Sequence, residues 1–161
     1  MLYRVRQLYY AIYPRIKTEE LEWAMSLLPP CSLPLFEGQS LPEQRHALDV
    51  ALDLHTSGIQ VSHLLVAALL HDCGKIKHPL KMWERIAIVL LQKLPQQIWE
   101  HIESSQSPLS LSLRTAHAHP SWGAELAQEF GLDPHIIELI REHHHPHSKE
   151  GRLLYEADNR H

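Results

Sequence analysis

Residues 61–75 read VSHLLVAALLHDCGK and contain the longest apolar run of the chain, residues 61–70. Residues 64–70 are apolar around the whole circumference of a helix, a pattern typical of a helix that is buried on every side. Ser62 is a residue type that caps helix starts. We therefore predict a central, buried helix from residue 62 to about residue 72. The run is shorter than the ~18–20 residues of a membrane-spanning helix, and we expect no membrane span.

The segments on both sides of this helix also follow the helical period. Apolar residues recur at i, i+3, i+4 and i+7 in one of them, as Ala47, Val50, Ala51 and Leu54. Capping and proline signals predict further helices over residues 18–28, 83–94, 96–103, 120–130 and 149–159, and one that begins at residue 134. We expect the stretch between residue 29 and Pro42 to be irregular because of its prolines, a helical pattern from Pro42 onward, and a loop or a ragged helix start over residues 104–112. No alternating strand pattern occurs, so the predicted fold class is all-α, a helical bundle.

The length of 161 residues predicts one domain, with a core over residues 42–161. Residues 1–41 differ from this core because they hold four of the five tyrosines, Tyr3, Tyr9, Tyr10 and Tyr13. We expect them to form a helical N-terminal extension that packs on the core. A role in binding a partner or a membrane surface is the alternative for this segment.

Composition excludes several classes of protein. The chain is 44% hydrophobic and 21% charged, which excludes a largely disordered chain, a collagen and a coiled-coil rod. Its net charge of −4 argues against general nucleic-acid binding. Two cysteines, Cys31 and Cys73, make no disulfide framework, and no signal peptide is evident, so we expect a cytoplasmic protein. The number of histidines, 14, is unusual and is the best indication of function.

Metal-competent side chains stand at the C-terminal ends of the predicted core-facing stripes. His71 follows one stripe, His143 and His144 follow another, and Asp158 ends a third, while His46 lies beside an apolar face. A polar group on an inward face needs a partner, because burial without one costs several kcal/mol. Several such groups on separate helices suggest that they share an ion.

These residues divide into two ligand sets that share one carboxylate. Asp72 is the natural bridge, since a carboxylate can join two first-row transition metals whose other ligands are neutral imidazoles. The first set is His46, His71, Asp72 and Asp158, and the second is Asp72, His119, His143 and His144. Two such ions acidify a bridging water into a hydroxide nucleophile and clamp the oxygens of an in-line displacement. Their excess positive charge would attract a phosphate anion.

Five blocks of this sequence resemble the HD-domain (HDIG-type) metal-dependent phosphohydrolases, over about residues 41–161. The blocks are Arg45-His46-Ala47, AALLHDCGK at 67–75, HPSWGAEL at 119–126, IREHH at 140–144, and Ala157-Asp158-Asn159. The resemblance implies an all-helical core, a one- or two-metal site between core helices, and hydrolysis of small phosphate esters, often nucleotides. Carried over by position, it implies the ligands named above, with Asp72 and Lys75 as catalytic residues. Lys75 would stabilise charge on the transferred phosphoryl group.

Some features depart from the family pattern. Cys73 replaces a common isoleucine, and Pro42 stands one turn before His46 where a further metal would need a carboxylate. The Gly-Tyr-Pro signature of the cyclic-di-GMP phosphodiesterase branch is missing, and only 13 residues separate His144 from Asp158. Cyclic-di-GMP is therefore a poor substrate prediction. The short form is closer to small nucleotide hydrolases, including the branch that splits diadenosine tetraphosphate.

Two other functions remain open at this point. Histidine-rich ligation is compatible with a di-iron HD-type oxygenase, and a non-catalytic regulatory HD domain is the third possibility. The ions expected are iron or manganese, with cobalt, nickel and zinc as alternatives, and an oligomer is possible. The remaining histidines fit no metal spacing and are expected to be exposed or capping groups: His55, His63, His78, His101, His135, His147 and His161.

Overall fold

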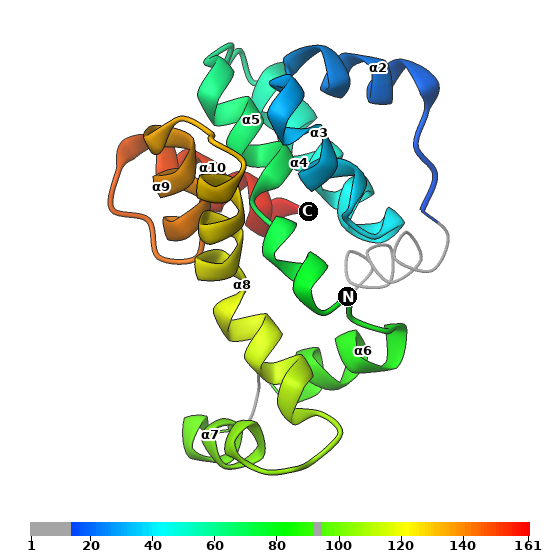
Figure 1. Ribbon diagram of the computed structural model, residues 1–161, viewed down its shortest axis with the longest axis vertical. Coiled ribbons are helices and arrows are strands. Elements are labelled where there is room, and N and C mark those ends of the chain that lie inside the picture. The colour runs from blue at the N-terminus through cyan, green and yellow to red at the C-terminus, as the bar shows by residue number, and fades with distance from the viewer. Residues whose placement is uncertain (1–13, 92–94) are drawn as a thin grey trace.

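The computed structural model describes residues 14–91 and 95–161, and all regular structure in these residues is helical. The all-α prediction is therefore confirmed (Figure 1). The α-helices are α2 (Thr18–Leu27), α3 (Leu33–Glu37), α4 (Leu41–Thr56), α5 (Ser62–Leu70), α6 (Met82–Leu91), α7 (Gln96–Ser104), α8 (Ser110–Glu129), α9 (Pro134–Glu142) and α10 (Lys149–Arg160). Two short 3₁₀ helices are η1 (Pro30–Ser32) and η2 (Cys73–Lys77). Tyr3, Tyr9, Tyr10 and Tyr13 lie outside the described residues.

Helix α5 is the centre of the bundle, as its apolar circumference predicts. Every residue from Leu64 to Leu70 is buried, and the helix contacts α2, α3, α4, α9 and α10. Burying one such leucine contributes about 1.5–3 kcal/mol, so this helix is a main source of stability. None of the described helices is long and apolar enough to cross a membrane.

Several predicted boundaries were wrong, and proline is the main reason. Helix α3 starts at Leu33, so Pro34 stands in a first turn, where a helix needs no N–H, rather than in irregular chain. Helix α4 starts at Leu41, one residue before the predicted start at Pro42. The N-cap of α5 is Val61, and Ser62, the predicted cap, is already the first residue of the helix. Helix α8 starts at Ser110 and continues through Pro120, which we expected to begin it.

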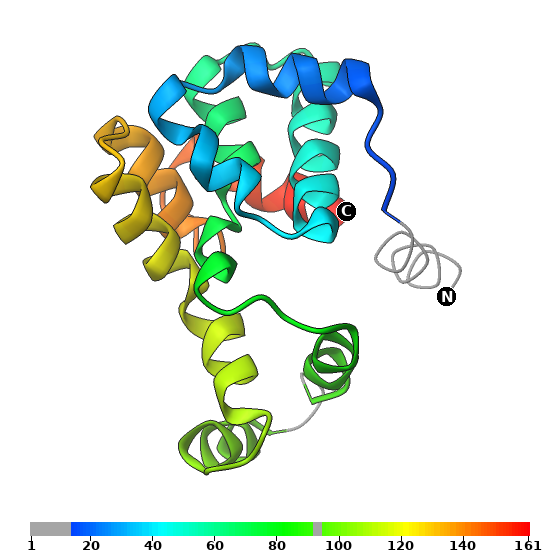
Figure 2. The ribbon, with the colours of Figure 1, turned by 45° about the vertical axis from the view of Figure 1, so that its right-hand side comes forward.

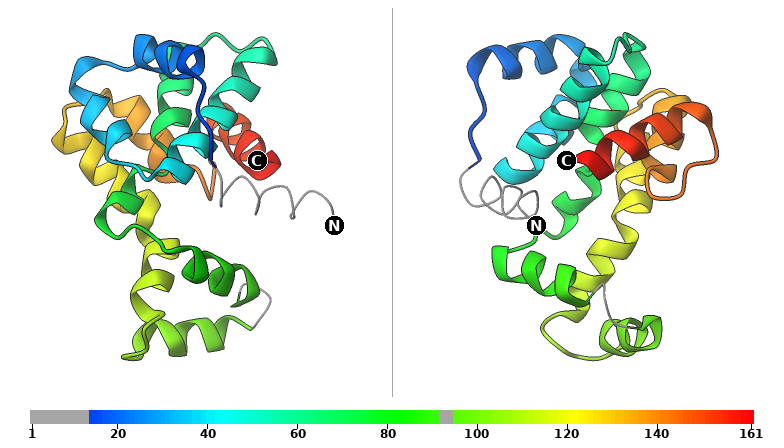
Figure 3. Two further views of the ribbon diagram at one scale, coloured as in Figure 1. Left: turned by 90° about the vertical axis from the view of Figure 1, so that its right-hand side faces the viewer. Right: turned by 180° about the vertical axis from the view of Figure 1, so that it is seen from behind.

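Helix α8 persists through its proline because both of its halves are held by neighbours. It contacts η2 and α9 within the bundle, and α6 and α7 outside it. Figure 2 shows α6 and α7 standing away from the bundle and attached to it along α8. Figure 3 shows α10 beside α4, and these two helices are in contact.

The turn after α5 packs backbone against backbone on α8. A Cβ at Gly74 would lie 2.0 Å from the carbonyl oxygen of His119 and 2.6 Å from the Gly123 nitrogen. Only glycine fits there, and the close approach places His119 next to the residues that end α5.

We expect Gly74→Ala to lower the free energy of unfolding by about 3 kcal/mol, because backbone atoms cannot yield to the new methyl group. Gly131→Ala is the matched control. Gly131 has a φ of +73° and nothing within 4 Å of an added Cβ, so its cost is conformational, about 1 kcal/mol. Urea denaturation of both variants checks the difference, and equal losses would show that the η2–α8 contact is looser than described.

Candidate metal centre

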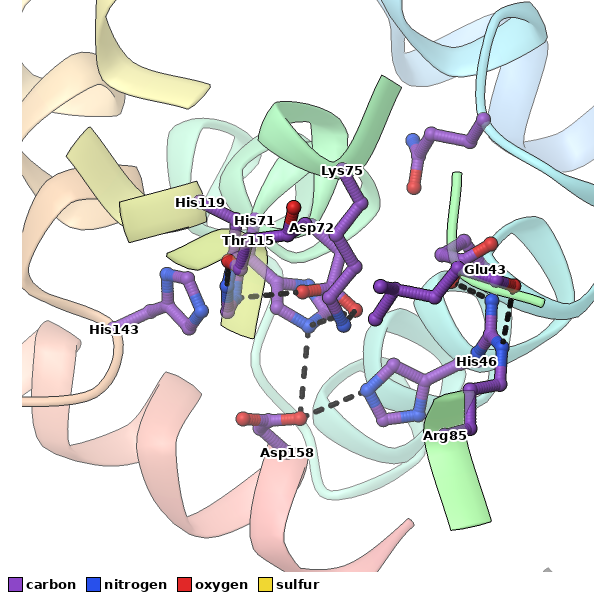
Figure 4. A network of polar contacts seen from close by, with 12 residues as sticks. Glu43, His46, His71, Asp72, Lys75, Arg85, Thr115, His119, His143 and Asp158 are labelled. Atoms are coloured by element: carbon purple, nitrogen blue, oxygen red, sulfur yellow. Dashed lines mark hydrogen bonds and ion pairs between the residues drawn. The ribbon is translucent and has the colours of Figure 1, made fainter. Parts of the chain in front are cut away.

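Seven polar side chains from five parts of the fold meet beside the end of α5. The structure brings together all seven residues predicted as ligands, at the ends or inner faces of helices: His46 on α4, His71 and Asp72 after α5, His119 on α8, His143 and His144 after α9, and Asp158 on α10. Figure 4 shows most of them converging. The Nε2 atom of His46 lies 2.8 Å from Asp158 Oδ1, and the Nε2 atom of His71 lies 3.5 Å from the same oxygen.

Asp72 lies between two groups of imidazoles. Its Oδ2 atom is 3.7 Å from His71 Nε2, and its Oδ1 atom is 3.1 Å from His119 Nε2. The ligand atoms of His46, His71 and Asp72 lie within 4.8 Å of one another, as do those of His119, His143 and His144. One carboxylate oxygen thus faces each group, which is the arrangement that a bridging ligand requires.

Three buried imidazoles are oriented by the same kind of hydrogen bond. The Nδ1–H groups of His71, His119 and His143 donate to main-chain carbonyl oxygens at 2.8, 2.9 and 2.7 Å. A carbonyl oxygen can only accept, so each Nδ1 carries a proton and Nε2 is the atom left to bind an ion. Among the described residues no aligned hydrogen-bond partner reaches these three Nε2 atoms. Each would cost about 1–3 kcal/mol if left unsatisfied, and an ion bound between them removes that cost.

Both inner carboxyl groups are held in the ionised form. Burial raises the pKa of Asp72, but the ammonium group of Lys75, with Nζ 2.6 Å from Oδ2, and the His71 ring hold it well below its ordinary value. Burial likewise raises the pKa of Asp158, and its contacts with His46 and His71 outweigh this and lower it. The centre therefore contains two carboxylates at neutral pH.

Three of the imidazoles, those of His71, His143 and His144, fall into two electrostatic classes. Burial lowers the pKa of His71, but the carboxylates of Asp72 and Asp158 raise it to about 9. Burial and neighbouring imidazoles lower the pKa of His143 well below its ordinary value, and burial with His119 lowers that of His144 to about 4. His143 and His144 are thus neutral and ready to coordinate, whereas His71 holds a proton that a metal ion must displace.

A cavity of about 230 Å³ opens onto this centre. His46, Asp72, His144 and Asp158 face it from the centre, and the remaining lining residues are Pro42, Glu43, Lys75 and Arg85. His119 and His143 are more deeply buried than the partly exposed His144. Two cations, Lys75 and Arg85, therefore stand beside a set of metal-competent side chains.

Sequence reasoning missed Arg85 and Glu43. Arg85 lies on α6 and pairs with the buried carboxylate of Glu43, one turn before His46 on α4 (Figure 4). We looked for a further carboxylate at position 42, whereas the acidic residue beside the cavity is at position 43. The i−3 spacing of Glu43 from His46 was a usable signal, but nothing in the sequence connects Arg85 to α4.

Three other residues that the sequence offered as candidates, His117, His145 and Cys73, lie outside the centre. His117 is largely exposed and faces Glu103, so His119 is the member of this pair that points inward. His145 is exposed. Cys73 is buried against Gly123, and burial raises the pKa of its thiol to about 12. Such a thiol is unreactive, and its place in the core explains why the isoleucine of the family motif can be replaced here.

The structure adds a contact that the sequence did not predict. His63 and His135 are partly exposed, as expected, but they meet Glu150 in a separate cluster. The three residues are distant in sequence and meet only because the first turns of α5, α9 and α10 lie close together. Sequence spacing could not show this.

Comparison with known proteins identifies the fold family. A family model described as the HD domain matches residues 44–161, which is well over half of the chain. No curated protein and no solved structure matches the chain. The HD domain defines a superfamily of hydrolases that are mostly metal-dependent phosphohydrolases. The matched range contains every residue of the centre described above, and the chain belongs to the HD-domain family.

Proposed function

We propose that this protein is a two-metal phosphohydrolase that acts on a nucleotide or another small phosphate ester. The observation that carries the proposal is the set of three buried Nε2 atoms that converge on a carboxylate whose two oxygens face both imidazole groups. The first ion would be held by His46, His71, Asp72 and Asp158, and the second by Asp72, His119, His143 and His144. Mixed imidazole and carboxylate ligands suit iron or manganese better than magnesium.

The donor set fits ions of this kind in number and chemistry. Every imidazole in the buried group presents Nε2 and is oriented through Nδ1, as metal-bound histidines usually are. Two divalent ions bound there supply Lewis acidity, a lowered pKa for a water molecule, and a clamp for the attacking and leaving oxygens.

The chain's own residues bind and orient the phosphate. Lys75 is partly exposed to the cavity and has its ammonium group 2.6 Å from Asp72, next to the ligands. It can therefore donate to a phosphoryl oxygen and stabilise the charge that develops there. Arg85, held by Glu43 at the cavity wall, is placed for a second contact with the same group or with the next phosphate.

The cavity suits the phosphoryl end of a substrate. Its volume of about 230 Å³ is below the range of about 300–1,000 Å³ that encloses a whole drug-sized ligand, so a nucleoside would extend beyond it. The preference for small nucleotides over a cyclic dinucleotide rests on the missing Gly-Tyr-Pro signature.

The protonation of His71 predicts a pH-dependent metal affinity. With its pKa raised to about 9, His71 is protonated in the metal-free protein at neutral pH, and coordination must displace that proton. The affinity for Mn²⁺ is expected to rise about tenfold per pH unit between pH 6 and pH 8, with about one proton released per ion bound at this position. Calorimetry in buffers of different ionisation enthalpy measures both quantities, and a flat affinity without proton release would contradict the protonated state.

Release of phosphate or of a nucleotide product from a substrate panel tests the function. Protein reconstituted anaerobically with Fe²⁺ or Mn²⁺ is incubated with nucleoside mono-, di- and triphosphates and with dinucleoside polyphosphates. We expect metal-dependent hydrolysis of at least one of them. Oxygen uptake is followed in the same samples, because substrate-dependent uptake without release of phosphate or a nucleotide product would replace the hydrolase by an oxygenase. Metal binding with neither activity would favour the regulatory domain.

A further inference from the structure

A second group of metal-competent side chains lies at the opposite end of α5 from the metal centre. His63 is in the first turn of α5, His135 in the first turn of α9, and Glu150 in the first turn of α10. His63 and His71 are separated by eight residues, or about 12 Å along a helix. The cluster of these three residues is therefore distinct from the centre.

The distances within this cluster are close to those of a coordination shell. The Nε2 atom of His63 lies 3.1 Å from both carboxylate oxygens of Glu150, and the Nε2 atom of His135 lies 2.5 Å from Oε2. All three ligand atoms fall within 4.8 Å of one another. Bonds of about 2.0–2.1 Å in a tetrahedral zinc site separate neighbouring ligand atoms by about 3.3 Å, so small side-chain movements suffice.

The two imidazoles and the carboxylate are presented by rigid helix starts. Asp133 caps α9 by accepting the N–H of His135, and Ser148 caps α10 by accepting the N–H of Gly151. The side chains of the cluster are 38%, 48% and 31% exposed for His63, His135 and Glu150, so an ion and a water ligand can reach it from solvent. The partial positive charge at the N-terminus of each helix repels a cation, but this repulsion is weak compared with the energy of coordination bonds.

We propose that His63, His135 and Glu150 form a second metal site that takes Zn²⁺ or a similar borderline divalent ion. Two imidazoles and one carboxylate with an open fourth position are a donor set that zinc accepts, with water completing the tetrahedron. The ion cross-links the starts of α5, α9 and α10. The same three helices carry His71, His143 and Asp158 at or after their other ends. The site therefore acts as a structural clamp on the helices that position the centre.

Zinc stoichiometry tests the site independently of any enzymatic activity. Wild type, the double variant His63→Gln/His135→Gln, and the single variant Glu150→Gln are dialysed against 1–10 equivalents of ZnCl₂, and bound zinc per chain is measured. His147→Gln is the matched control, because His147 is an exposed histidine whose Nδ1 lies 3.4 Å from Glu142 and which belongs to neither the cluster nor the centre. Melting temperatures with and without zinc are recorded for all four proteins.

We expect wild type and the control to bind one more zinc ion per chain than the double variant. Loss of a residue that hydrogen-bonds to a metal ligand typically weakens metal binding by about 10–100-fold. Glu150→Gln removes a ligand itself, so it should weaken zinc binding at this position by more than that. Zinc should raise the melting temperature of wild type more than that of either site variant. Equal zinc stoichiometry in all soluble variants would show that the cluster is not a zinc site and that the two histidines only form hydrogen bonds with Glu150. If the double variant does not fold, Glu150→Gln alone decides between the two outcomes.

Discussion

Asp72→Asn is expected to abolish hydrolysis and to remove metal from the centre. Asp72 is the residue whose two oxygens face both imidazole groups, and an amide cannot bridge two cations. We expect kcat/KM to fall about 10⁴-fold or more and bound metal to fall to one ion per chain or fewer. Metal analysis and steady-state kinetics on the same preparation measure both effects.

A matched carboxylate controls for surface effects of this substitution. Glu138→Gln changes an exposed carboxylate on α9 that pairs with Arg141, and it should alter neither metal content nor rate. The fold of the Asp72 variant is checked by its helical circular dichroism, because Lys75 and His71 lose a charged partner. A folded Asp72→Asn protein with wild-type rate would refute the assignment of Asp72 as the shared ligand.

Lys75→Met is expected to separate catalysis from metal binding. The ammonium group faces the cavity and contacts Asp72, but it is not a metal ligand. Removing it should lower kcat by about 10²–10³-fold, as expected for a lost group that stabilises transition-state charge. Metal content should stay near the wild-type value, because the imidazoles remain oriented by their own Nδ1 hydrogen bonds.

Two neighbouring cations make this prediction specific. Arg85→Met should act mainly on KM, by about tenfold, because Arg85 lies at the cavity wall rather than beside Asp72. Lys77→Met should have no effect, since Lys77 pairs with Glu125 on the surface. If Lys75→Met and Lys77→Met retained equal activity, Lys75 would have no role in the chemical step.

The sequence predicted the fold class and the residues that meet at the centre better than it predicted the helix boundaries. His71-Asp72, His143-His144 and Asp158 could be found because each follows an apolar stripe, so the helical period alone places them on an inward face. His46 and His119 needed the order of the family motifs as well. The structure then added their orientation, through main-chain carbonyls that no sequence pattern encodes.

What the sequence missed depends on contacts between distant segments. Pro120 was read as a helix start, but contacts along both halves of α8 keep the helix continuous through it. Arg85 reaches the cavity only because α6 lies opposite α4, and His63 meets His135 only because two helix starts lie side by side. These pairings arise from the packing of the bundle, and the local spacing of residues cannot predict them.

The number of metal ions bound per chain distinguishes a two-metal centre from the alternatives. It is best measured on untagged His63→Gln/His135→Gln protein purified without chelator, so that the cluster at the start of α5 does not contribute to the count. We expect close to two ions per chain, with iron or manganese dominant. A value near one would leave His119, His143 and His144 as substrate contacts, and a value that stays near zero after anaerobic reconstitution would contradict the two-metal centre altogether.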